Sequence, residues 1–75
     1  MASAIIWSKN GCGYCTAAKQ LLTFQNIPYE ERNISGDEWT REQLLEAVPT
    51  AKTLPQIFLD GEYVGGYTEL KQRIG

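Results

Sequence analysis

Two cysteines separated by two residues stand between a strand-like run and a helix-like run, and this placement limits the folds open to the chain. The motif is Cys12-Gly13-Tyr14-Cys15, and it holds the only cysteines of a 75-residue sequence that contains no histidine. The run from Ala4 to Trp7 is apolar and β-rich, which is typical of a buried central strand. The pattern therefore predicts an α/β domain whose chemistry lies where its first strand feeds its first helix.

The first predicted helix runs from Cys12 to about Gln25. Its apolar residues recur at helical spacing and are expected on one face: Tyr14, Ala18, Leu21 and Leu22. Asn26 and Pro28 end it. The charged run from Tyr29 to Ile34 is predicted to be a second strand at an edge of the sheet.

A second helix is predicted between Glu38 and Val48. Residues 35–37, Ser-Gly-Asp, offer caps for its start, and Pro49 marks its end. Its inner face is expected to consist of Leu44, Leu45 and Val48.

The last part of the chain contains a strong hairpin signal. Asp60-Gly61 lies between two β-rich runs, 56–59 and 62–65, which we expect to be antiparallel neighbours. Thr68 is then expected to cap a short helix that carries three side chains inward: Tyr67, Leu70 and Ile74. The resulting order, βαβαββα, predicts a single domain over residues 1–75.

Charge and length exclude several classes of function. The 7 basic and 9 acidic residues give a net charge of -2, so the chain offers no basic stripe for nucleic acid or an anionic membrane. The start, Met1 to Trp7, has no basic segment and too few apolar residues for a signal peptide or a membrane span. We therefore expect a cytoplasmic protein, and in that reducing compartment a cysteine pair is more often catalytic or metal-binding than structural.

Position in the helix assigns different roles to the two thiols. A free cysteine, with a pKa of about 8.5, is only about 3% thiolate at neutral pH, and the thiolate is the attacking species. The unpaired amides and the dipole at a helix start favour the anion of Cys12, and Lys9 is a candidate positive neighbour. Cys15 lies one turn further along, where Ala18 and the sheet should shield it. We therefore predict Cys12 as nucleophile and Cys15 as resolving thiol.

Two other interpretations of the cysteine pair are weaker. A structural zinc site needs four ligands, and this chain has no histidine and no further cysteine to complete one. A purely structural disulfide would close too short a loop to stabilise the fold much. Redox exchange is the favoured interpretation, and no metal ligand set is assigned.

Three separated segments resemble the motifs of the glutaredoxin family, which has the thioredoxin fold. Residues 9–15 are similar to K-x-x-C-P-Y-C, with Gly13 in place of the proline. Residues 53–58 resemble T-V-P-x-I-F, whose proline is cis, and residues 65–70 resemble G-G-x-D-D-L, which opens the last helix. The resemblance covers nearly the whole chain and implies a four-stranded mixed sheet flanked by three helices.

The resemblance also implies a glutathione-binding groove beside Cys12. Its expected residues are Lys9, Tyr14, Leu54, Pro55, Gly66, Tyr67 and Thr68. Lys9 would hold the glycyl carboxylate, and the backbone of Leu54 would pair with the cysteinyl amide as an added strand does. The helix start at Tyr67 and Thr68 would take the γ-glutamyl carboxylate. Lys52 matches a basic position of some relatives.

The implied activity is glutathione-dependent reduction of protein disulfides and glutathione mixed disulfides, with no tightly bound cofactor. The resemblance suggests ribonucleotide reductase as one protein client, and the expected form is a monomer. An alternative is a dimer that binds a [2Fe-2S] cluster through Cys12 and glutathione, as in some relatives with a small residue at the position of Gly13. Another is a thioredoxin-like reductase served by a flavin enzyme, which Lys9 and the helix start at Thr68 argue against.

Overall fold

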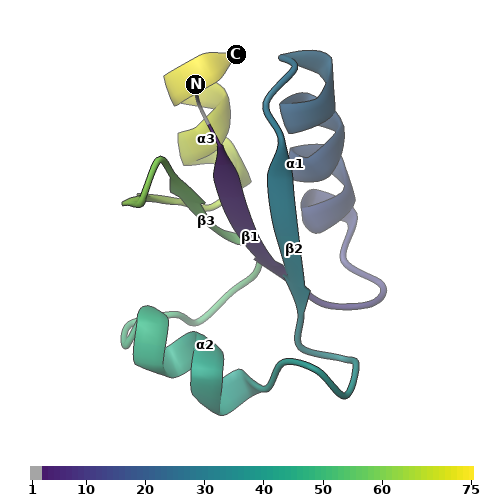
Figure 1. The fold of residues 1–75 in the computed structure, drawn as a ribbon, viewed down its shortest axis with the longest axis vertical. Helices are drawn as coiled ribbons and strands as arrows, with labels where there is room; N and C mark the ends of the chain where they lie inside the picture. The colour runs from purple at the N-terminus through teal and green to yellow at the C-terminus, as the bar shows by residue number, and fades with distance from the viewer. Residues whose placement is uncertain (1–2) are drawn as a thin grey trace.

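The computed structural model describes residues 3–75, in which four strands and three helices follow the order βαβαββα (Figure 1). The elements are β1 (Ala4–Ser8), α1 (Gly13–Phe24), β2 (Tyr29–Asn33), α2 (Arg41–Ala47), β3 (Gln56–Leu59), β4 (Glu62–Gly65) and α3 (Tyr67–Ile74). The predicted order and mixed sheet are confirmed. The expectation that the start of the chain is not a signal peptide includes Met1 and Ala2, and these two residues lie outside the described residues.

The sheet has the strand order β2-β1-β3-β4, which puts the apolar strand at the centre and the charged strand at an edge, as predicted. β1 runs parallel to β2, with Ala4 opposite Tyr29, and antiparallel to β3, with Ala4 opposite Leu59. Charged side chains on the outer strand discourage pairing with another chain. β3 and β4 form the predicted hairpin, and φ is 52° at Asp60 and 81° at Gly61, as a two-residue turn between twisted strands requires.

The main core lies between the sheet and a layer formed by α1 and α3, which lie side by side behind it in Figure 1. Alternation along β1 and β3 turns every second apolar side chain toward this layer. The buried cluster consists of Ala4, Ile6, Ala18, Leu22, Ile57, Leu59 and Leu70. Leu70 is fully buried, and Tyr67 and Ile74 pack against the cluster, so the inward face predicted for the last helix is confirmed.

Tyr14 was expected on the same face of the first helix as Ala18 and Leu22, and that expectation is wrong. Its side chain is 67% exposed, whereas Cys15 is 1% exposed. The buried stripe of α1 runs through Cys15, Ala18 and Leu22, each about one turn from the one before. Tyr14 lies about 100° around the helix from Cys15 and is therefore turned toward solvent.

α2 begins later than predicted, at Arg41 rather than near Glu38, and ends at Ala47. Thr40 is its N-cap: the Thr40 hydroxyl accepts from the Gln43 N–H at 3.2 Å, and the Gln43 side chain accepts from the Thr40 N–H at 2.8 Å. This reciprocal pair outcompetes the caps offered by residues 35–37, which form a turn. Leu44 and Val48 are buried and Leu45 is half-buried, as predicted for the inner face.

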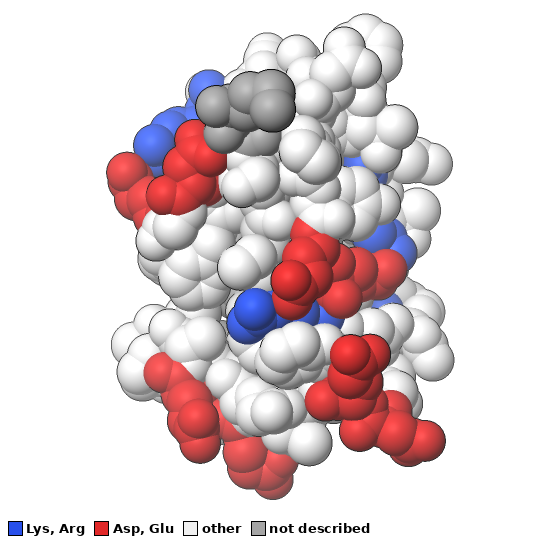
Figure 2. Space-filling view, in the orientation of Figure 1, with Lys and Arg blue, Asp and Glu red and all other residues white. Residues whose placement is uncertain are grey.

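An arginine between two tryptophans joins the segment before α2 to the sheet. The Arg32 guanidinium lies 5.2 Å from the centre of the Trp7 ring and 4.3 Å from that of Trp39, and the two rings meet edge to face at 5.4 Å. Figure 2 shows basic and acidic side chains next to one another across the middle of this face, and further acidic side chains at the end that α2 occupies in Figure 1. Among residues 3–75, no helix has the length and apolar character needed to cross a membrane.

Candidate active site

Cys12 and Cys15 form a disulfide at the start of α1. Cys12 is the N-cap residue, with extended backbone, and the Cys15 N–H donates to its Sγ at 3.1 Å. Cys12, which carries the outer sulfur, is half-buried, and its sulfur caps an amide of the helix start. Cys15, which carries the inner sulfur, is buried. This is the asymmetry predicted for a nucleophile and a resolving thiol.

The peptide bond between Leu54 and Pro55 is cis, as the family resemblance implies. The carbonyl oxygen of Leu54 lies 3.7 Å from Sγ of Cys12, although the two residues are far apart in the sequence. No backbone hydrogen bond within residues 3–75 uses the Leu54 N–H. An extended peptide thiol could therefore pair with Leu54 while its sulfur lies beside Cys12.

A groove, here called the Pro55 groove, brings most of the predicted binding residues together. It is lined by Tyr14, Thr53, Leu54, Pro55, Gly66, Tyr67, Thr68 and Glu69. The rings of Tyr14 and Tyr67 lie 5.9 Å apart at one side of it. Six of the seven expected groove residues line it, and Lys9 does not.

The groove ends at the start of α3, whose N-cap is Gly66 and not Thr68 as expected. The Gly66 N–H donates to the Glu69 carboxylate at 2.7 Å, so that amide is satisfied, while glycine has no side chain to cap the amides of the first turn. Thr68 lies in the first turn and is exposed. The first-turn amides of Tyr67 and Thr68 have no intrahelical acceptor and can receive an anion.

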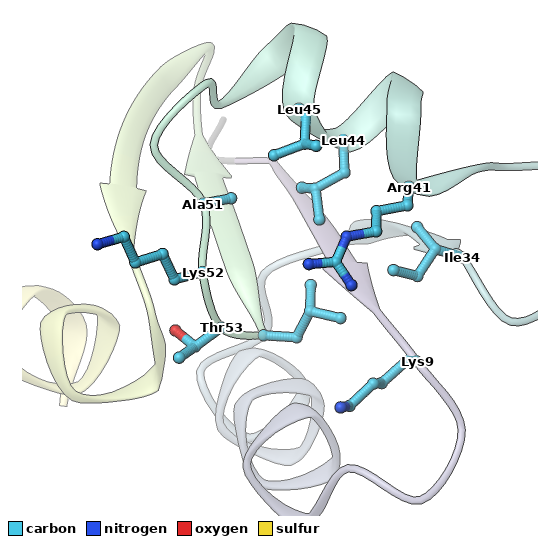
Figure 3. A pocket seen from close by; sticks show the side chains of 9 residues that line it. Lys9, Ile34, Arg41, Leu44, Leu45, Ala51, Lys52 and Thr53 are labelled. Atoms are coloured by element: carbon cyan, nitrogen blue, oxygen red, sulfur yellow. The ribbon is translucent and has the colours of Figure 1, made fainter.

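Lys9 lines a separate pocket on the other side of Leu54, together with Arg41 and Lys52 (Figure 3). This Arg41 pocket has apolar walls formed by Ile34, Leu44, Leu45, Ala51 and Leu54. In Figure 3, the Arg41 guanidinium points into the pocket, Lys9 lies at its edge, and the Lys52 amino group points away from both. None of the ion pairs found among residues 3–75 uses these three cations.

Arg41 was not predicted to be a site residue; it lies within the helix predicted between Glu38 and Val48, and no motif marks it. Lys9 also shares a shallow hollow with Cys12, lined further by Asn10, Gly11, Gly13, Thr16, Lys19 and Asn33. The position of Lys9 is therefore consistent with its expected place near the outer sulfur.

Ser8, the last residue of β1, links the strand before the cysteine loop to its neighbours. Its buried hydroxyl donates to the Glu31 carboxylate at 2.7 Å, and the Lys19 ammonium donates to the same oxygen at 2.9 Å. These bonds, with that of Ser8 the stronger cause, lower the pKa of Glu31 below its ordinary value. Three elements, β1, β2 and α1, are thus joined beside the loop that carries Cys12.

Comparison with known proteins places this arrangement in a family. A family model described as glutaredoxin matches residues 4–64. Glutaredoxin 3 of Escherichia coli K12 is 36% identical over 70 residues, which cover 93% of this chain and 83% of that protein.

No group of three or more histidine, cysteine, aspartate or glutamate side chains in residues 3–75 is arranged to hold a metal ion.

Solved structures of glutaredoxins have a fold similar to that of this chain. The crystal structure of glutaredoxin 1 from Francisella tularensis, complexed with cacodylate, is 35% identical with a TM-score of 0.81 and covers 97% of this chain and 92% of that one. A buckwheat glutaredoxin, solved as a glutathione complex, matches in fold with a TM-score of 0.79 at 23% identity, over 93% of this chain and 66% of that one. The chain therefore belongs to the glutaredoxin family of thiol–disulfide oxidoreductases and has the thioredoxin fold.

Proposed function

We propose that this chain reduces glutathione mixed disulfides and protein disulfides with glutathione as co-substrate. The observation that carries the proposal is the position of the Cys12 sulfur, 3.7 Å from the carbonyl of Leu54, whose N–H has no backbone partner within residues 3–75. Glutathione is a short extended peptide with a thiol at its centre and a carboxylate at each end. A backbone edge next to the reactive sulfur fits its middle, and anion-binding groups on either side fit its ends.

The two ends are assigned to the two sites that flank Leu54. The γ-glutamyl carboxylate would accept from the first-turn amides of α3 at Tyr67 and Thr68. The glycyl carboxylate would lie at the Arg41 pocket, which Lys9 and Arg41 both line. The exposed ring of Tyr14 would line the groove between them.

The proposed reaction begins when the Cys12 thiolate attacks the glutathione sulfur of a mixed disulfide. A Cys12–glutathione disulfide forms, the bond to the client sulfur breaks, and the client leaves as a thiolate that takes up a proton. A second glutathione thiolate then attacks the bound glutathione sulfur, which releases oxidised glutathione and restores the Cys12 thiolate. The amide of Cys15 and the helix start favour that anion in each cycle.

A client protein disulfide requires the second cysteine. Attack by Cys12 gives a mixed disulfide with the client, and Cys15 then attacks the Cys12 sulfur, releasing the client dithiol and leaving the intramolecular disulfide seen here. Two glutathione molecules reduce this disulfide and become oxidised glutathione. Turnover needs a pool of reduced glutathione, which suits a reducing compartment such as the cytosol.

Single-cysteine variants test these roles. With a glutathionylated peptide, Cys12→Ser should abolish turnover and Cys15→Ser should keep it, whereas with a protein disulfide both should lose it. Retained deglutathionylation in Cys12→Ser would overturn the assignment. Equal turnover with glutathione and with a flavin-dependent reductase would instead favour the thioredoxin-like alternative.

Matched lysine variants test the glycyl end. Lys9→Met should raise KM for the glutathionylated peptide with little change in kcat, because a charge-assisted contact to the bound carboxylate is lost. Lys71→Met removes a cation of the same type from the last turn of α3 and should leave both constants unchanged. Equal effects of the two variants would contradict the assignment of Lys9.

Cluster binding is a second proposal, and one observation favours it. Apart from the chain neighbours of Gly13 and the helix backbone, no atom of residues 3–75 lies within 4 Å of the place where a Cβ at position 13 would stand, so the helix start next to Cys12 is open there. Cys15 is buried, so each chain offers one accessible thiolate, and a cluster would need two chains and two glutathione thiolates. Anaerobic reconstitution with iron, sulfide and glutathione should then give visible absorbance and a dimer, and a colourless monomer would reject the proposal.

A further inference from the structure

A buried glutamine connects the outer strand of the hairpin to the backbone of the Pro55 groove. Gln56 directly follows the cis proline and is 5% exposed. Its Nε2 donates to the carbonyl oxygen of Thr53 at 2.7 Å, and its Oε1 accepts from the Tyr63 hydroxyl at 2.6 Å. Both ends of the amide are therefore used, one by the groove segment and one by β4.

The orientation of this amide is determined by its partners. A backbone carbonyl only accepts hydrogen bonds, so the Nε2 of Gln56 must face Thr53. The remaining oxygen needs a donor, and the Tyr63 hydroxyl provides it. The ring of Tyr63 packs on Phe58 at 5.4 Å, which holds the hydroxyl in place on the sheet.

Fixing the Thr53 carbonyl also fixes the Leu54 N–H. The two groups belong to the same peptide unit, which is planar and trans, so they point in opposite directions. The bond from Gln56 to Thr53 therefore turns the Leu54 N–H away from Gln56. That N–H has no backbone partner within residues 3–75, so it is available to a bound peptide.

We propose that Gln56 is a positioning residue for substrate: through the Thr53 carbonyl it orients the Leu54 N–H for pairing with a peptide thiol, and Tyr63 holds the Gln56 amide in the required orientation. Neither residue lines the Pro55 groove. The proposal rests on the proposed function, because it takes glutathione as the peptide that pairs with Leu54.

Steady-state kinetics with a glutathionylated peptide tests the proposal. Gln56→Met keeps the length of the side chain and removes both hydrogen bonds, and it should raise KM about fivefold, the equivalent of one hydrogen bond, with kcat within about twofold of wild type. Tyr63→Phe removes only the hydroxyl and should raise KM about twofold. If Gln56→Met does not fold, Tyr63→Phe alone decides the question.

A core variant separates positioning from a general loss of stability. Ile57→Val removes a buried methyl group from the neighbouring residue of β3, which faces the opposite side of the sheet, and it should lower Tm without changing KM. If Gln56→Met and Tyr63→Phe change KM no more than Ile57→Val does, the proposal is rejected.

Amide hydrogen exchange in the absence of glutathione distinguishes this proposal from the proposed function. Gln56→Met should accelerate exchange at Leu54 relative to wild type and to Ile57→Val, because the peptide unit is no longer held. Unchanged exchange at Leu54 would reject the positioning role even if the wild type is active. Absence of wild-type turnover with glutathione would reject the proposed function, while the exchange result would still decide whether Gln56 orients Leu54.

Discussion

The backbone N–H of Asn10 donates to the Ser35 hydroxyl at 3.0 Å, which ties the loop that carries Cys12 to the segment after β2. The side chain of Asn33 completes the link: its amide donates to the Asn10 side-chain oxygen at 3.0 Å, and its oxygen accepts from the Ser35 N–H at 2.8 Å. The loop before Cys12 is thus held by a neighbouring strand end as well as by its own chain.

Removing the Ser35 hydroxyl should loosen this loop. Ser35→Ala is expected to lower the free energy of unfolding by about 0.5–1 kcal/mol, the net value of one hydrogen bond, and to accelerate amide exchange at Asn10. Urea denaturation and amide exchange measure the two effects. Thr50→Ala, another exposed hydroxyl removal, should leave exchange at Asn10 unchanged. Identical exchange in Ser35→Ala and wild type would show that this bond does not hold the loop.

Proline at position 13 should stabilise the protein. Gly13 is the first residue of α1, where proline is favoured, and beyond its chain neighbours and the helix backbone no atom of residues 3–75 lies within 4 Å of an added Cβ. The preceding residue, Cys12, has φ -103° and ψ 106°, which a following proline permits. Gly13→Pro should therefore raise the free energy of unfolding by about 0.5–1 kcal/mol, measured by denaturation of the reduced protein.

At Gly11, two residues before Gly13, replacement of glycine is expected to destabilise the protein. Its φ of 72° lies in the left-handed region, so Gly11→Ala should destabilise the protein although the space around it is equally open. A stabilising effect of Gly11→Ala, or a loss of stability in Gly13→Pro, would mean that the loop differs in solution from the arrangement described.

The hairpin and the central strand were predictable because local rules determine them. Asp60-Gly61 adopts positive φ at both positions, which few residue pairs tolerate. The cysteine pair was predictable for the same reason, since a strand, a short loop and a helix are read directly along the chain.

The features that were missed depend on choices between similar residues or on distant contacts. Ser35, Asp37 and Thr40 are all suitable N-caps, and only the reach of the Gln43 side chain decides for Thr40. The meeting of Arg41 and Lys9 at one pocket is a contact between distant parts of the chain, which no local pattern predicts. Likewise, helical periodicity cannot tell whether the buried face of α1 passes through the residue at position 14 or at position 15.

The pKa of Glu31 predicts how stability changes with pH. The hydroxyl of Ser8 and then the ammonium of Lys19 lower this pKa below its ordinary value of 4.5 in the folded protein. The unfolded chain therefore binds the proton more readily, so the stabilisation is present above about pH 4.5 and is lost as the pH falls through the folded pKa. Glu31→Gln should be less stable than wild type at pH 7, and the difference should shrink at pH 3.

Urea denaturation at the two pH values measures this difference. Glu46→Gln, an exposed carboxylate outside the ion pairs found in residues 3–75, serves as the control and should change stability little at either pH. A Glu31→Gln deficit of equal size at pH 7 and pH 3 would mean that the carboxylate charge is not what stabilises the link between β1, β2 and α1.

Because Arg32 stacks on two tryptophan rings, we predict that a positive charge alone at position 32 does not preserve the stability of the fold. The planar guanidinium of Arg32 lies over Trp39 and close to Trp7, a geometry that an ammonium group does not reproduce. Arg32→Lys should therefore lower the free energy of unfolding by about 0.5–1 kcal/mol and change tryptophan emission, because Trp39 is no longer held against the sheet. Arg73→Lys, in the exposed pair with Glu62, should stay within about 0.5 kcal/mol of wild type with unchanged emission. If the two lysine variants are equally stable and emit alike, the segment before α2 is held by something other than this stack.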